Sequence, residues 1–315
     1  MRGNEKVAAE VTLPPGIILP KGYLSVSQIE TYLKCGIQYY FRYIEGLISP
    51  PSIELGTGKA GHAALELNFT HKAVNGADAP LDEVLDHFSD RFEAEMQDVS
   101  SQNATYKGAV KDKTTKLIEI HQDKVAPNLV PASPDDIEGK IEMPIAGIPM
   151  VGYYDLATQS TVIDHKFVSR TKSKADADNS LQLTFYARAT GKKDVAFNCL
   201  IKSNKRDSGT WSEPRVNIVS GNPRNAQDFQ WLESVVRYVA NAISAGIFLP
   251  APPDHWACTK KWCGYYHKCR GAGKDVSPKI IQMSGTRDVK LPADTKQQKP
   301  VLGGPVTTKI HEVNS

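Results

Sequence analysis

Three consecutive apolar runs of strand length lie in the middle of this chain and constrain its fold more than any other feature. They cover residues 137–145, 150–158 and 161–168, and short turns containing glycine or serine join them. Apolar runs of this length, separated by turn residues, are typical of neighbouring β-strands. Short turns join antiparallel strands, because a parallel pair needs a long crossover connection. The middle of the chain is therefore predicted to form a β-sheet.

Helical patterns flank these strands on both sides. A first helix is expected to begin at the capping-box pattern Ser27-Gln28-Ile29-Glu30 and to carry an apolar stripe as far as Ile44. Further helices are expected at 58–72, 81–96, 114–124, 181–190 and 226–247, and further strands at 195–202 and 213–219. The sequence therefore predicts a domain that combines helices with strands.

The chain of 315 residues is long enough for one large domain or two modest ones. Residues 1–22 are punctuated by Pro and Gly and are expected to form a flexible arm. Residues 272–315 are rich in Lys, Gln, Thr, Pro and Gly and are expected to be a disordered tail. The folded domain is then predicted to span 23–271, with a helical insertion at about 75–136.

Composition excludes few classes of protein. The hydrophobic content of 40% and the charged content of 23% are ordinary for a globular chain. A net charge of +3 permits a nucleic-acid partner without requiring one. Neither an apolar run long enough to span a bilayer nor a signal-peptide pattern is found, so we expect a cytoplasmic protein with no membrane association.

The run 161–168 contains the tripeptide Asp164-His165-Lys166. Residues two apart on a strand point to the same face, so Asp164 and Lys166 are expected to lie side by side. A carboxylate and an ammonium in apolar surroundings are costly to desolvate unless each has a partner. A bound cation and a nearby anion would serve as those partners, although a polar outer face of a half-buried strand would give the same pattern.

Two more residues are candidates for the same site. Asp155 lies on the preceding strand, close enough across the short Gln159-Ser160 turn to converge with Asp164 on a hard cation. His62 on a helix could complete the shell of ligands. Taken singly, His62 is more often an ordinary helix histidine and Asp155 could cap a turn, so the prediction rests on the set.

Gln182 and Tyr186 lie four residues apart on the helix that follows the Asp164 strand. They share one helical face and could contact a phosphate or a catalytic water. The alternative is that they are partly buried polar residues, because Leu181 and Phe185 mark the core side of the same helix.

Three of the five cysteines cluster near the end of the predicted domain. Cys258, Cys263 and Cys269 lie within twelve positions, and three thiols this close in a reducing compartment suggest soft-metal ligation. A tetrahedral site needs a fourth ligand, for which Cys35 is the first candidate and His255 and His267 are rivals that would imply zinc. Cys199, in the middle of a strand, is better explained as a buried thiol.

These residues, in this order, resemble the RecB-type branch of the PD-(D/E)XK nuclease superfamily over about residues 23–270. The stretch from Leu24 to Tyr43 is similar to the family's N-terminal helix, and Gly58-Lys59-Ala60-Gly61-His62 to its histidine motif. Gly152-Tyr153-Tyr154-Asp155 and Asp164-His165-Lys166 resemble its two acidic motifs, and Gln182 to Tyr186 its Gln-x-x-x-Tyr motif.

The resemblance implies an α/β nuclease core, a mixed central sheet flanked by helices, with an N-terminal helical region and a C-terminal cysteine cluster at 258–269. It implies that His62, Asp155, Asp164 and the backbone carbonyl of His165 hold Mg²⁺ or Mn²⁺. Lys166 would orient the attacking water and stabilise the transition state. Gln182 and Tyr186 would position the DNA backbone.

The family's iron–sulfur branch holds a 4Fe-4S cluster with one N-terminal and three C-terminal cysteines, which Cys35, Cys258, Cys263 and Cys269 would match. Four residues separate Cys258 from Cys263, where the commonest pattern has two, so zinc or no metal remains an alternative.

The function implied is a metal-dependent deoxyribonuclease, an exonuclease acting in DNA recombination, repair or replication. DNA is the expected substrate and a helicase or recombination protein a candidate partner, because the sequence has no Walker-type ATP motif of its own. The alternatives are a structure-selective endonuclease with the same site and a catalytically silent DNA-binding or assembly subunit. The intact set of Asp155, Asp164 and Lys166 argues against the silent subunit.

Overall fold

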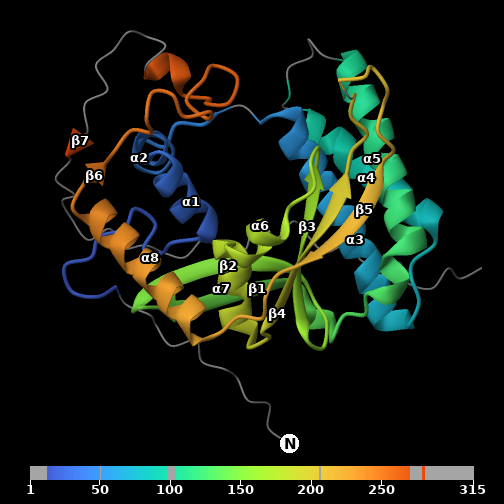
Figure 1. Cartoon of the computed structure of the whole chain (residues 1–315), viewed down its shortest axis with the longest axis horizontal. Coiled ribbons are helices and arrows are strands. Elements are labelled where there is room, and N and C mark those ends of the chain that lie inside the picture. Colours follow the sequence, from blue (N-terminus) through green and yellow to red (C-terminus); the bar gives the residue numbers. More distant parts are fainter. Residues whose placement is uncertain are drawn as a thin grey trace, which may run out of the picture.

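The computed structural model describes residues 13–49, 51–97, 99, 104–205, 207–269 and 279–280. A central sheet separates two groups of helices (Figure 1). It contains five strands in the order β1-β2-β3-β4-β5. The strands are β1 (Ile137–Ile145), β2 (Ile148–Ala157), β3 (Thr161–Val168), β4 (Asp194–Ile201) and β5 (Arg215–Ser220).

The sheet is mixed, as predicted. Strands β1, β2 and β3 pair antiparallel, β3 and β4 run parallel, and β5 returns antiparallel to β4. The parallel step needs a crossover, which is supplied by helices α6 (Lys174–Asp178) and α7 (Leu181–Thr190). Strands β2 and β3 lie in the interior of the sheet, because β1 and β5 are its two edge strands.

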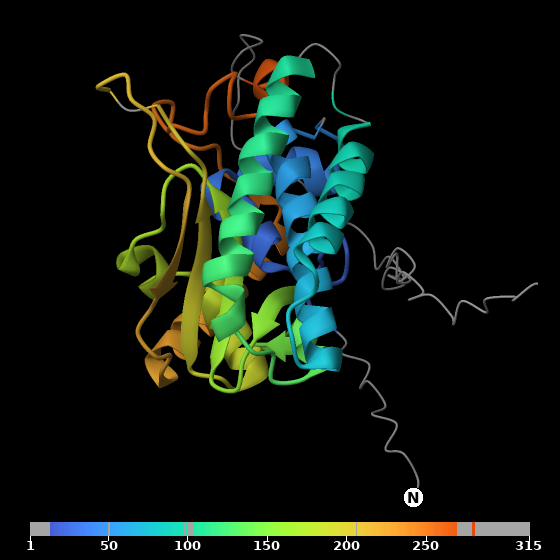
Figure 2. The same ribbon diagram turned by 90° about the vertical axis from the view of Figure 1, so that its right-hand side faces the viewer.

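Helices α3 (Ile53–Asn75), α4 (Leu81–Met96) and α5 (Ala104–Lys124) form one group, seen side by side in Figure 2. Leu65 and Phe69 of α3 and Leu117 of α5 pack against Ile163 and Leu200 of the sheet.

On the opposite face lie α7, α8 (Ala226–Ser244) and α1 (Val26–Lys34). Phe185 of α7 and Val236 of α8 share a core there with Met150 of β2 and Ile29 of α1. Strand β4 is buried on both of its faces, and its sequence is therefore a nearly continuous apolar run.

The first helix differs from its prediction in two ways. Its N-cap is Ser25, whose side chain accepts a hydrogen bond from the Gln28 amide, so the prediction of a capping box at Ser27 is wrong. The helix also stops at Cys35, which adopts an extended conformation with φ −165°. The chain then continues through α2 (Gly36–Tyr39) and a π-helical turn over Tyr40–Ile44.

A close tertiary contact accounts for this break. The Gly36 amide donates to the Leu249 carbonyl at 2.7 Å, and a Cβ at position 36 would lie 2.7 Å from the Leu249 nitrogen. Only glycine lets the two backbones approach so closely. The contact holds Cys35 beside the segment that follows α8 and β6 (Ile247–Phe248).

The remaining boundaries shift by a few residues at most, apart from two helices that begin earlier than predicted. Helix α3 starts at Ile53, capped by Ser52, and α5 starts at Ala104. Residues 13–22 of the expected flexible arm contact the core, with Leu19 buried and the Ile18 amide donating to Ser244. Short helical turns lie at Ala126–Asn128, Pro134–Asp136 and Tyr266–Lys268, and Lys279–Ile280 forms β7. Residues 1–12 and almost all of the expected tail, 272–315, lie outside the described residues.

Two glycines of α3 offer a matched test of how this helix meets the sheet. A Cβ at Gly61 would overlap the ring of Phe167 on β3, whereas a Cβ at Gly58 would meet nothing within 4 Å. We expect Gly61→Ala to lower stability by about 1–3 kcal/mol through overpacking. Gly58→Ala should raise it by up to about 1 kcal/mol, because alanine favours helix. Urea unfolding of both variants checks the pair, and an equally stable Gly61→Ala would contradict the close contact.

Candidate active site

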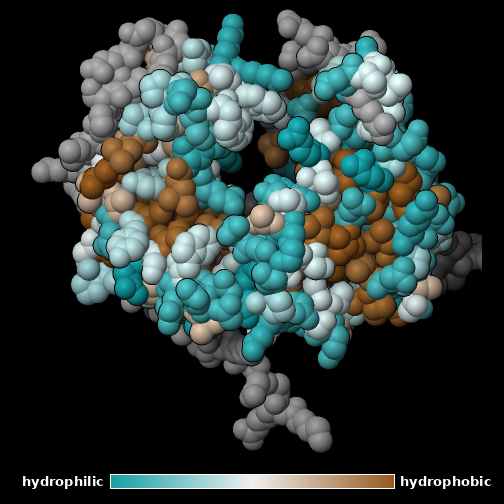
Figure 3. Space-filling model, viewed as in Figure 1, coloured by the Kyte–Doolittle hydropathy of each residue, from teal (hydrophilic) through white to brown (hydrophobic). Residues whose placement is uncertain are grey.

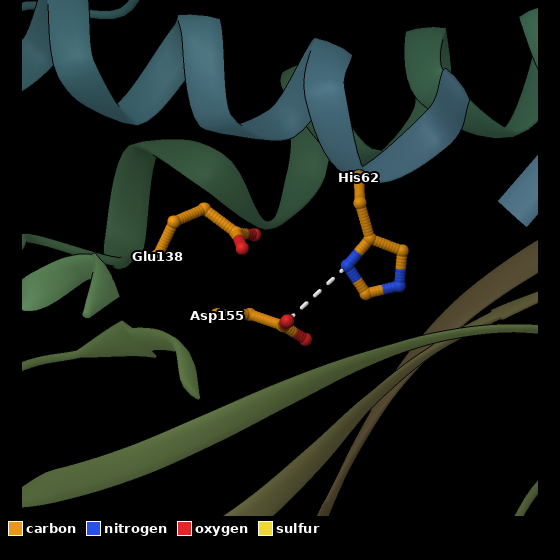
Figure 4. Close-up of side chains that lie close together, drawn as sticks. All are labelled: His62, Glu138 and Asp155. Atoms are coloured by element: carbon orange, nitrogen blue, oxygen red, sulfur yellow. Dashed lines mark ion pairs between the residues drawn. The ribbon is translucent and has the colours of Figure 1, made fainter. Parts of the chain in front are cut away.

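Three side chains from three different elements converge beside the middle of the sheet (Figure 4). His62 comes from α3, Glu138 from the start of β1 and Asp155 from β2. One ligand atom of each lies within 4.8 Å of the ligand atoms of the other two. An imidazole nitrogen and two carboxylates at this spacing form a set of donors suited to a divalent cation.

Asp155 lies where β2 and β3 separate, since their ladder ends at the Leu156–Ile163 pair. Its Oδ2 accepts a hydrogen bond from the His165 amide at 2.5 Å. The carboxylate thus supplies the acceptor that a paired neighbouring strand would otherwise supply. Its Oδ1 lies 3.2 Å from His62 Nδ1. Both oxygens are thus held in place.

Electrostatic coupling ties Asp155 to His62. Burial would raise the pKa of Asp155, but the His62 ring and the His165 amide outweigh it and hold that pKa below its usual value. Burial would lower the pKa of His62, but the Asp155 carboxylate raises it to about 9. Without a cation, the two side chains therefore form an ion pair at neutral pH.

Glu138 is the site residue that the sequence analysis missed. Its backbone has φ 47°, a left-handed conformation uncommon for a residue other than glycine. Burial and the neighbouring Asp155 raise its pKa to about 8, so the carboxyl group is protonated at neutral pH. A buried, protonated carboxyl beside an ionised one is a common arrangement at functional sites.

The turn between β1 and β2 determines which residue of β1 lies opposite Asp155, and it could have identified Glu138 as a site residue. Ala146 and Gly147 both have positive φ and form a two-residue turn, so Ile145 pairs with Ile148. That register brings Ile137 opposite Leu156 and Gly139 opposite Tyr154, which leaves Glu138 opposite Asp155. The predicted start of the second strand at residue 150 implies a longer loop, in which the pairing of Glu138 with Asp155 cannot be recognised.

Asp164 and Lys166 lie side by side on β3, as the two-residue spacing predicts. Lys166 Nζ lies 2.7 Å from Asp164 Oδ2, and the Asp164 side chain is only 2% exposed. Burial, together with Asp155, raises the pKa of Asp164 to about 6. This burial rules out the alternative of a solvated outer face. Asp164 does not belong to the trio of His62, Glu138 and Asp155, although its charge acts on His62.

Lys166 begins a chain of hydrogen bonds that extends to α7. Its Nζ donates to Gln182 Oε1 at 2.9 Å, and Gln182 Nε2 donates to the Tyr186 hydroxyl at 2.7 Å. Burial, followed by the Asp164 charge, raises the pKa of Tyr186, so the phenol stays protonated. Gln182 and Tyr186 thus contact the site through Lys166, and Lys166 keeps a fixed position between α7 and β3.

A buried polar network behind β3 was also missed. Asn198 Nδ2 lies 2.9 Å from one ring nitrogen of His165 and 2.9 Å from one of His121. Burial lowers the pKa of His165 to about 4 and that of His121 to about 3, so both rings are neutral. Strand β4 places Asn198 opposite His165 in the sheet. The network therefore fixes the position of His165, whose backbone amide holds the Asp155 carboxylate.

The four candidate cluster cysteines line one cavity on the side of the molecule that carries α1 and α2. The cavity is lined by Cys35, Cys258, Cys263 and Cys269 together with residues that include Phe41 and Tyr265. Cys35 Sγ accepts a hydrogen bond from the Ala251 amide at 3.4 Å. Burial raises the pKa of Cys263, and Cys35 and Cys258 raise it further. Cys199 lies apart, fully buried in the sheet.

Through the described ranges, no helix is both long and apolar enough to cross a membrane. The fold and the site together define a class of protein, a mixed sheet flanked by helices with a carboxylate–lysine centre that suits a divalent cation. The sequence profile described as "PD-(D/E)XK nuclease superfamily" matches residues 23–270, most of the chain. The protein therefore belongs to the PD-(D/E)XK nuclease superfamily, whose members use divalent metals.

Solved structures give more distant similarities. A candidate exonuclease from Eubacterium rectale aligns with a TM-score of 0.46 and 14% identity over 82% of this chain and 92% of its own. The protein SSO0001 aligns with a TM-score of 0.35 and 11% identity over 81% of this chain and 88% of its own. No curated protein shows significant similarity to this sequence.

Proposed function

We propose that this nuclease is a Mg²⁺- or Mn²⁺-dependent deoxyribonuclease. The observation that carries the proposal is the convergence of His62, Glu138 and Asp155 beside the buried Asp164–Lys166 pair. A hard divalent cation prefers carboxylate oxygens and tolerates an imidazole. In our proposal, His62, Asp155, Asp164 and the His165 carbonyl hold the ion, and Glu138 joins them.

Each residue then has a definite task. A bound cation would lower the pKa of a water molecule and offset charge on the scissile phosphate. Lys166, fixed between Asp164 and Gln182, orients the attacking water and donates to the charge that develops in the transition state. Gln182 and Tyr186 keep the lysine in place and face the DNA backbone.

We further propose that cleavage begins at DNA ends, in recombination, repair or replication, with a helicase or recombination protein as partner. The rival is a structure-selective endonuclease with the same site. Incubation with end-labelled linear DNA and with covalently closed circular DNA, each with Mn²⁺, separates the two. Degradation of the linear substrate alone is the expected result. Nicking of the closed circle would overturn the exonuclease proposal and favour the endonuclease.

Metal affinity should rise steeply with pH. The ligands must lose their protons to bind a cation, and the pKa values of His62 and Glu138 lie at about 9 and about 8. Both groups are therefore protonated at pH 6 and increasingly deprotonated towards pH 9. We expect the Kd for Mn²⁺ to be at least about tenfold lower at pH 8 than at pH 6.

Isothermal titration calorimetry in buffers of different ionisation enthalpy tests this expectation and counts the protons released. The Glu138→Gln variant should bind more weakly and release fewer protons than the original chain. A Kd that stays the same from pH 6 to pH 8 would contradict the assignment of these two ligands.

We also propose that Cys35, Cys258, Cys263 and Cys269 hold a 4Fe-4S cluster. All four cysteines line one cavity, which supports a shared centre for them. Visible absorbance of anaerobically purified protein would support the cluster, whereas colourless protein with zinc would favour the alternative.

We also propose a cytoplasmic location, because a reducing compartment keeps cysteine thiols available for metal ligation.

A further inference from the structure

A buried polar network lies behind the active site, and the proposed catalytic steps do not use it. Apolar residues, brown in Figure 3, gather where the sheet meets the group of α3, α4 and α5. Phe69 of α3 lies in this layer, and its ring contacts the imidazoles of His121 on α5 and His165 on β3. Asn198 of β4 lies between the two histidines. The exposed fractions of His121, Asn198 and His165 are 0%, 0% and 2%, so the network is closed to solvent.

Asn198 joins the two histidines. It interrupts the otherwise apolar run 195–201 of β4. Its Nδ2 lies 2.9 Å from His121 Nε2 and 2.9 Å from His165 Nδ1. Both imidazoles are neutral, because burial lowers their pKa values, and a neutral ring has one nitrogen that accepts a hydrogen bond. The amide group of Asn198 has two hydrogens, so it donates one hydrogen bond to each ring and connects α5 to β3.

This arrangement contributes little to stability. Among the described residues, His121 Nδ1, His165 Nε2 and Asn198 Oδ1 are buried without a hydrogen-bond partner. Unpaired polar atoms in the interior lower stability, whereas apolar side chains of similar shape would avoid this loss. Buried polar groups that a fold retains at such a cost are often found at functional sites. The network therefore calls for a functional explanation.

His165 connects the network to the proposed metal centre through its backbone. Its amide donates to Asp155 Oδ2 at 2.5 Å, and its carbonyl is a ligand in our proposal. The ladder between β2 and β3 ends at the Leu156–Ile163 pair, so within the described sheet His165 is paired on the β4 side alone. Fixing the imidazole ring through Asn198 therefore helps to fix both backbone groups. A displacement of His165 would move a ligand and an anchor of Asp155 together.

We infer that Asn198 and His121 are positioning residues, which act through His165 to set the affinity of the centre for a divalent cation. The inference rests on the proposed function and adds to it two residues that are too deeply buried to touch a substrate. Groups that hold metal ligands from behind fix the orientation of those ligands, and their loss typically weakens metal binding about 10–100-fold. Asn198 holds the imidazole of His165, and His121 holds Asn198.

Isothermal titration calorimetry with Mn²⁺ tests the inference without cleavage. Asn198→Leu keeps the approximate size of the side chain but donates no hydrogen bond. We expect its Kd for Mn²⁺ to rise about 10–100-fold. Gln28→Leu is the matched control, because Gln28 is a buried amide on α1, across the sheet from the network, where it accepts a hydrogen bond from the Tyr39 hydroxyl. Its loss should lower the thermal midpoint and leave the Kd for Mn²⁺ unchanged.

A pair of variants at His121 separates hydrogen bonding from packing. Glutamine places a side-chain oxygen near the position of the imidazole Nε2, so it can still accept the hydrogen bond from Asn198, whereas leucine cannot. We expect His121→Gln to keep the Kd of the original chain for Mn²⁺ and His121→Leu to raise it. A side chain that served only to fill space would not show this rescue.

Three outcomes would overturn the inference. The first is an unchanged Kd for Mn²⁺ in folded Asn198→Leu protein, and the second is an equal loss of affinity in Gln28→Leu, which would assign the effect to general destabilisation. The third is an equal Kd in His121→Gln and His121→Leu, and this comparison decides the case if Asn198→Leu does not fold. Failure of the original chain itself to bind Mn²⁺ would count against the proposed function instead, so the two failures are distinguished.

Discussion

Replacing Lys166 with methionine is expected to lower the rate of DNA cleavage a hundredfold or more. Lys166 Nζ lies 2.7 Å from Asp164 and 2.9 Å from Gln182, and it is the cation that would donate to the charge developing on the phosphate. Removing one donor of this kind typically costs about 3–4 kcal/mol of transition-state stabilisation. Methionine keeps the length of the side chain, so packing changes little.

The fold should survive this substitution. Without the lysine, the buried Asp164 carboxyl can take up a proton, because burial already raises its pKa to about 6. Asp164→Asn should cause a similar loss of activity. Lys116→Met is the matched control, since Lys116 lies on the surface of α5 in an ion pair with Glu119. Full activity in both Lys166→Met and Asp164→Asn, measured by single-turnover cleavage, would contradict the assignment of the site.

The second large effect concerns stability. If Cys35, Cys258, Cys263 and Cys269 share one metal centre, they join the end of α1 to the segment after α8, and this closure spans most of the domain. A metal that binds only the folded state contributes its binding free energy to folding. Cys269→Ser should therefore give poorly soluble or protease-sensitive protein. The visible spectrum of this variant should lack the absorbance of the metal centre.

Cys199→Ala is the control for this experiment. Cys199 is fully buried on β4, away from the cavity that the other four cysteines line. Losing its sulfur should cost about 1 kcal/mol and leave any metal in place. Limited proteolysis with metal analysis compares the two variants. Stable, active Cys269→Ser protein without metal would remove the structural role that we propose for the cluster.

Local patterns predicted much of the fold. The helices at 81–96 and 181–190 and the strands at 137–145 and 161–168 have the boundaries that the sequence predicts. In each of these elements the apolar period agrees with the flanking turn or cap residues, so local preference and tertiary packing coincide. The convergence of Asp155 with His62 follows from the short turn between the two strands together with motifs that occur in the family's order.

Features set by tertiary contact could not be predicted in this way. The apolar stripe of the first helix continues past Cys35, yet the Gly36–Leu249 contact ends the helix there. Helix α3 begins five residues before its predicted start, because packing of Ile53 and Gly56 on α4 outweighs the low helix preference of Gly56. Glu138 joined the site only through a strand register that depends on one two-residue turn.

We propose that His62, Glu138 and Asp155 form a metal-dependent centre for phosphodiester hydrolysis. The most direct measurement is Mn²⁺-dependent cleavage of end-labelled linear DNA by the original chain and by Asp155→Asn, which keeps the size of the side chain but removes its charge. We predict cleavage by the original chain with Mn²⁺, none in EDTA, and a loss of at least about a hundredfold in the variant. Cleavage that persists in EDTA, or an Asp155→Asn variant as active as the original chain, would contradict the claim.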